Sequence, residues 1–150
     1  MISIPEEMAS QHLRESFSKG DVLFWRGFPG LERKRNSYFV LLTNCINDQF
    51  IVARATRQIE HYSGATAKRL EHDIIFIKKN ETTIFPEDTI IDLTWIEKFT
   101  IENLSKLLGS DISRKGTLPT DVIQRINDAV RMAVTISERD RKLILKTSKT

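Results

Sequence analysis

The chain has few of the residues and segments that mark specialised proteins. Cys45 is its only cysteine, which rules out a disulfide within the chain and argues against a cysteine-based zinc site. No apolar run approaches the roughly 20 residues needed to span a bilayer. The first 20 residues carry several charges and no apolar stretch, unlike a secretory signal. We therefore expect a cytoplasmic protein with no membrane partner.

The motifs of the commonest enzyme classes are missing as well. The sequence has no GxxxxGK[ST] loop, no GxGxxG, no HExxH and no GxSxG. Its three histidines, His12, His61 and His72, are not spaced as zinc ligands on one helix. We expect no cofactor and no metal, so any chemistry would come from ordinary side chains.

Short apolar segments and one amphipathic helix predict an α+β domain. The segment Thr120–Ile136 repeats apolar residues at the i, i+3, i+4 spacing of a single helical face. Before it, short apolar runs separated by turn residues predict a mainly β region, arranged as a small curled sheet or barrel that this helix closes. We divide the chain into an N-terminal helical extension (1–18), the barrel domain (19–137) and a charged tail (138–150). The expected strands are 22–28, 38–43, 50–59, 74–77, 89–93 and 110–117, with 95–99 extending or bending the fifth.

Charge is distributed unevenly along the chain. The net charge is +3. The segment Lys19–Lys79 has eleven basic and six acidic residues, whereas 80–131 has six basic and nine acidic ones. A basic region of this kind suits a phosphate-rich partner, although a solvated surface would have the same composition.

Metal-free RNA cleavage is one reaction that such residues support. The 2′-hydroxyl of RNA attacks the adjacent phosphorus, so the protein has to hold the phosphate, stabilise charge and transfer protons. Candidate groups are Arg35 on a predicted loop, Thr56 on a predicted strand and His61 just beyond it. Each also has a simpler explanation. Arg35 would be part of a solvated loop cluster, Thr56 a residue that favours strands, and His61 a surface histidine. Alternation along the strand places Arg54 and Thr56 on one face.

The order of these segments resembles the MazF/PemK family of toxin endoribonucleases. The similarity covers roughly 19–136 and lies in the order of the segments, since no single one is specific. The segments that carry it are Gly20–Phe24, Tyr38–Asn44, Phe50–Thr56, Asp88–Leu93, Ile96–Thr100 and Gly116–Pro119.

This resemblance implies an SH3-like β-barrel, a homodimer, and the toxin of a type II toxin–antitoxin system that cleaves single-stranded RNA without metal and is inhibited by a cognate antitoxin. The family's strand threonine corresponds to Thr56. The family's arginine precedes its second strand, where the nearest arginine here is Arg35, with Arg33 as the alternative. We expect the basic residues around these positions to bind RNA: Arg33, Lys34, Arg54 and Arg57.

Two other functions remain open. The chain would be a nucleic-acid-binding module without catalysis if its basic segment holds phosphates but does not cleave. The related CcdB toxins share the barrel and target DNA gyrase through C-terminal residues, a role for which the tail here lacks the terminal aromatic residue.

Overall fold

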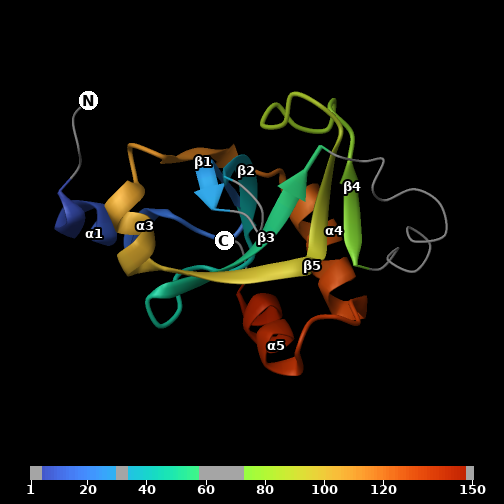
Figure 1. Cartoon of the computed structure of the whole chain (residues 1–150). Helices are drawn as coiled ribbons and strands as arrows, with labels where there is room; N and C mark the ends of the chain where they lie inside the picture. The colour runs from blue at the N-terminus through green and yellow to red at the C-terminus, as the bar shows by residue number, and fades with distance from the viewer. Residues whose placement is uncertain (1–4, 30–33, 58–72, 148–150) are drawn as a thin grey trace.

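The computed structural model describes residues 5–29, 34–57 and 73–147 (Figure 1). Helices and strands alternate irregularly along the chain, in the manner of an α+β protein. The elements are α1 (Glu6–Ser16), β1 (Asp21–Pro29), β2 (Lys34–Leu41), β3 (Gln49–Thr56), β4 (Ile74–Ile77), β5 (Thr89–Thr100), α3 (Ile101–Leu107), β6 (Ile112–Thr117), α4 (Thr120–Met132) and α5 (Glu138–Lys146).

The described strands form one six-stranded sheet, in the order β4-β5-β3-β2-β1-β6, with antiparallel pairing between neighbours. Among the described residues, β4 pairs only with β5 and β6 only with β1, so the sheet is open at these two edges. The predicted α+β class is confirmed, whereas closure into a barrel is not seen in this part of the chain.

Helix α4 covers one face of the sheet. Its residues Val122, Ile126 and Val130 are almost completely buried against Val40 and Ala53 of the sheet. The predicted amphipathic helix is therefore confirmed, but it ends at Met132 instead of Ile136. The guanidinium of Arg141 donates to the carbonyl oxygens of Val130, Ala133 and Ile136, satisfying backbone acceptors at the helix end.

Helices α1 and α3 cover part of the opposite face (Figure 1). In α1, which we expected as an extension of the domain, Ala9 and Leu13 have no exposed surface and pack in the same cluster as Leu104 of α3. The Thr100 side chain caps α3, because it accepts a hydrogen bond from the Asn103 backbone at 3.2 Å. The first helix thus belongs to the core of the domain.

The β1–β2 hairpin is longer than the sequence predicts. We expected Arg35 on a loop, and this expectation is wrong, because β2 already begins at Lys34. A bulge between Trp25 and Phe28 allows the two strands to stay paired to that point. Gly27 lies in this bulge with φ +72°, and its backbone N–H donates to the Asn36 side chain at 2.9 Å. Arg35 is consequently held on a strand.

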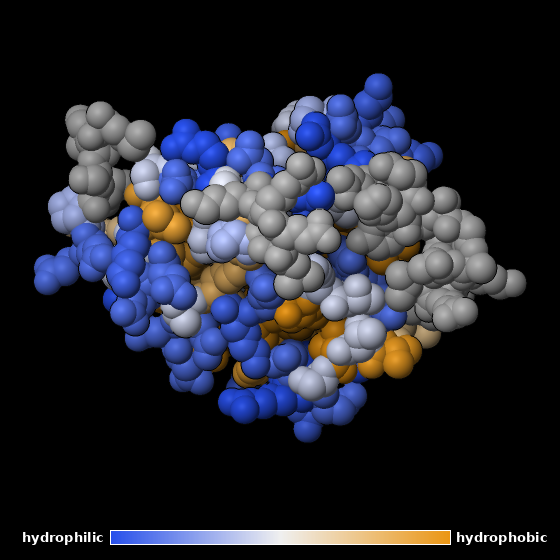
Figure 2. All heavy atoms as spheres, viewed as in Figure 1, coloured by the Kyte–Doolittle hydropathy of each residue, from blue (hydrophilic) through white to orange (hydrophobic). Residues whose placement is uncertain are grey.

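The outer surface is largely hydrophilic, with hydrophobic atoms in small groups on the face that Figure 2 shows. Large hydrophobic side chains that are exposed among the described residues are Met8, Phe76, Met132 and Val134. None of the described helices is both long enough and apolar enough to pass through a membrane.

A buried lysine ties helix α5 to the rest of the domain. Lys19 is 2% exposed, and its ammonium donates to Asn127 Oδ1 at 2.6 Å and to the carbonyl oxygens of Ile144 at 2.8 Å and Thr147 at 3.0 Å. Ile144 itself is completely buried. The segment that we expected as a charged tail therefore contains a helix with a core residue and an anchored C-terminal end.

Burial and the nearby charge of Arg131 lower the pKa of Lys19 from its ordinary 10.5 to about 8. Between these pH values the unfolded chain holds more protons than the folded one, so the contribution of Lys19 to the free energy of unfolding rises with pH, by up to about 3 kcal/mol. We expect the free energy of unfolding of the wild type, measured by urea titration, to rise relative to that of Lys19→Met between pH 8 and 10.5. A constant difference would contradict this.

Candidate functional site

Two central strands bring the predicted polar residues onto one face of the sheet. In the β2–β3 register, Phe39 lies opposite Arg54 and Tyr38 opposite Ala55. Because side chains alternate along a strand, Arg54 and Thr56 share the face of Phe39, and so do Ser37 and Arg35. We call Arg35, Ser37, Arg54 and Thr56 the β2–β3 polar face.

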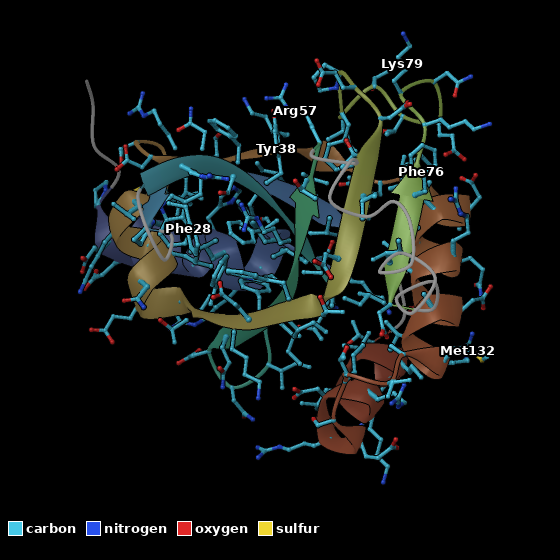
Figure 3. All side chains as sticks on the ribbon, turned by 45° about the vertical axis from the view of Figure 1, so that its right-hand side comes forward. Phe28, Tyr38, Arg57, Phe76, Lys79 and Met132 are labelled. Atoms are coloured by element: carbon cyan, nitrogen blue, oxygen red, sulfur yellow. The ribbon has the colours of Figure 1, made fainter. Side chains whose placement is uncertain are left out.

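The polar face borders a cluster of aromatic side chains that includes Phe28, Phe39 and Phe99. Arg35 lies directly opposite Phe28 in the β1–β2 register. The Phe28 ring is 4.8 Å from the Phe39 ring and 6.1 Å from the Phe99 ring, measured between centroids. Figure 3 shows Phe28 within the curve of the sheet. The polar face is thus the continuation, on the same side, of the core covered by α1 and α3.

The exposure of the four side chains differs. Arg35 is exposed, Arg54 and Thr56 are half-buried, and Ser37 is 4% exposed. The Ser37 hydroxyl donates to the carbonyl oxygen of Arg35 at 3.3 Å. The face therefore presents two guanidinium groups and the partly accessible Thr56 side chain.

Strand β5 adds two residues that the sequence does not single out. Asp92, which is 8% exposed, lies opposite Arg54, and its carboxylate accepts hydrogen bonds from the backbone and hydroxyl of Thr94. Trp95 lies under the Arg54 guanidinium, with Cζ 5.0 Å from the ring centroid. A cation over an indole face is attracted by the ring quadrupole.

Ion pairing distinguishes the arginines of this face from most others. Arg35 and Arg54 make no ion pair with the described residues, and outside the face the same holds for Arg139 on α5. Each of the other described arginines contacts a carboxylate at 2.7–3.3 Å: Arg14, Arg26, Arg57, Arg114, Arg125, Arg131 and Arg141. Guanidinium groups that make no ion pair with the described residues are suited to bind an anion.

The other residues that the sequence predicts for the site are Arg57, Lys34, Arg33 and His61. Arg57 follows the last residue of β3 and forms an exposed ion pair with Glu87 at 3.3 Å. Figure 3 shows Arg57 near the upper rim of the sheet. Lys34 has its backbone in β2, but its side chain lies outside the described residues, as do Arg33 and His61.

Potential metal ligands do not gather in the part of the chain that the structure describes. No cluster of three or more histidine, cysteine, aspartate or glutamate side chains among these residues is arranged to hold a metal ion.

No protein-family model matches the sequence, and no curated protein matches it. The resemblance to toxin endoribonucleases therefore rests on the order of segments described above, and the function has to be argued from the polar face itself.

Proposed function

We propose that the protein is a metal-independent endoribonuclease of the MazF/PemK type, acting on single-stranded RNA as the toxin of a toxin–antitoxin pair. The observation that carries the proposal is the β2–β3 polar face, which has Arg35, Arg54 and Thr56 on one side of the sheet, with neither arginine ion-paired to the described residues. The family's SH3-like barrel, homodimer and cognate antitoxin are part of the same proposal.

The chemistry follows from what these groups do to a phosphodiester. A guanidinium donates two parallel N–H bonds to phosphate oxygens and stabilises the negative charge that grows there in the transition state. A threonine hydroxyl orients another oxygen by a hydrogen bond. The 2′-hydroxyl supplies the nucleophile, so the products are a 2′,3′-cyclic phosphate and a free 5′-hydroxyl. His61 stays the candidate for proton transfer.

Incubation of the purified protein with a long single-stranded RNA in EDTA tests the proposal. We expect cleavage at discrete positions, with 2′,3′-cyclic phosphate ends, at a rate unchanged by the chelator. A matched DNA strand, which has no 2′-hydroxyl, is the control and should stay intact. RNA that remains uncleaved, or cleavage that EDTA abolishes, would contradict the proposal.

A second candidate is a nucleic-acid-binding module that does not cleave. One observation favours it: the part of the polar face that the structure describes contains no histidine, and the nearby Asp92 carboxylate already accepts hydrogen bonds from Thr94. Retention of intact RNA, weakened by salt, would identify this function.

The third function, gyrase inhibition through C-terminal residues, has less support. Ile144 is completely buried, and Leu143 and Leu145 pack against the same core. These apolar side chains are therefore largely occupied within the domain.

A further inference from the structure

We propose that Arg54 is the residue that anchors the RNA phosphate, and that Trp95 is a positioning residue which holds its guanidinium ready to bind. This inference rests on the proposed function and deepens it, because the resemblance assigns the main arginine role to Arg35. Both arginines lie on the β2–β3 polar face, but among the described residues only the Arg54 guanidinium lies over an aromatic ring there.

The stacked geometry prepares Arg54 for an anion. A cation over an indole ring keeps its full charge, and its N–H groups are the donors that bind phosphate oxygens. Arg54 is half-buried, with Cζ 5.0 Å from the Trp95 ring centroid. Less side-chain freedom is lost on binding when an arginine is already held in one orientation. Arg35, which is exposed, has no such support among the described residues.

A local irregularity of β5 places Trp95 under Arg54. Opposite β3, Asp92 pairs with Arg54 and Ile96 with Ala53, so residues 93–95 have no partner on that strand. Extra residues of this kind change the direction of side chains and occur next to functional sites. The Trp95 Nε1 is buried and has no acceptor among the described residues. Hydrogen bonding of the indole to the described residues therefore does not explain its position, and its ring lies against the Arg54 guanidinium.

The electrostatic setting agrees with an anion site. Asp92 lies opposite Arg54 in the register, yet no ion pair links them; its Oδ1 accepts instead from the Thr94 backbone at 2.9 Å. The Arg54 charge is therefore not neutralised by a contact within the described residues. A half-buried cation that makes no ion pair with the described residues gains more from a bound phosphate than one already paired with a carboxylate.

Binding of a fluorescein-labelled, single-stranded 2′-O-methyl RNA to the full chain tests this inference by anisotropy at several salt concentrations, since that probe cannot be cleaved through its 2′ position. We expect Arg54→Gln to weaken binding about tenfold and to lower the salt slope by about 0.7, which is one phosphate contact for a single strand. Arg54→Lys should recover only part of the loss, because it restores the charge without the planar fork.

A double-mutant cycle separates positioning from general structural effects. We expect Trp95→Leu to weaken binding about fivefold in the wild-type background and by less than about twofold when Arg54 is already glutamine, because its effect acts through Arg54. Trp95→Phe, which keeps an aromatic face, should stay within about twofold of wild type. Thermal unfolding of each variant confirms that it is folded at the assay temperature.

Arg139→Gln is the matched control, because Arg139 also lacks an ion pair among the described residues but lies on α5, which packs on the opposite face. It should bind as wild type does. Suppose that wild type binds and cleaves RNA, but that Arg54→Gln and Trp95→Leu leave RNA affinity unchanged or weaken it by independent amounts. The inference is then overturned and the proposed function stands. If wild type neither binds nor cleaves RNA, both are overturned.

Discussion

Replacement of Arg35 by alanine is expected to lower the rate constant for RNA cleavage at saturating substrate by at least about a hundredfold, without a change in fold. Arg35 is exposed on β2 and makes no ion pair with the described residues, so its loss leaves no buried group unpaired. A donor that stabilises charge only in the transition state contributes about 10²–10³ in rate. Single-turnover cleavage of a defined RNA, with thermal unfolding as the measure of fold, checks the expectation.

Two comparisons sharpen this result. Arg57→Ala should reduce cleavage about threefold or less, because Arg57 lies beyond the end of β3 and is already paired with Glu87. Thr56→Ser should retain most activity and Thr56→Val should lose it, if the hydroxyl orients the phosphate. An Arg35→Ala variant as active as wild type would remove Arg35 from the chemistry and transfer the main role to Arg54.

Replacement of Gly20 by alanine is expected to destabilise the fold by about 3 kcal/mol. Gly20 has φ +95°, and a Cβ there would lie 2.5 Å from Ile123 Cδ1, a side chain that is 4% exposed. The backbone strain costs about 1–2 kcal/mol and the overpacking a similar amount. Gly20 also joins two elements, since its N–H donates to Leu41 and its carbonyl accepts from Leu118.

Gly27→Ala provides the control for that measurement. Gly27 also has a positive φ, +72°, but a Cβ added there would have no atom within 4 Å. Its replacement therefore carries only the backbone cost, about 1 kcal/mol. We expect the melting temperature to fall by about 6–12 °C for Gly20→Ala and about 2–4 °C for Gly27→Ala. Equal shifts would show that the contact with Ile123 is not tight.

Local patterns along the chain were sufficient for much of the secondary structure. Apolar residues at helical spacing predicted α4, and alternation in β3 predicted that Arg54 and Thr56 share a face. These features depend on neighbouring residues alone. The start of β2 was missed, because it depends on pairing with β1 across a bulge at Trp25–Phe28.

The amino-acid sequence by itself determined the α+β class, the amphipathic closing helix and the polar residues of β3, since these follow from periods of about 3.6 and 2 residues. Only the tertiary structure decided which arginines are paired with carboxylates and that Trp95 lies beneath Arg54. Arg125 meets Glu81 from 44 residues away, and Trp95 meets Arg54 through unpaired residues in β5. Such contacts join distant segments and follow no local period, because the folding of the whole sheet brings them together.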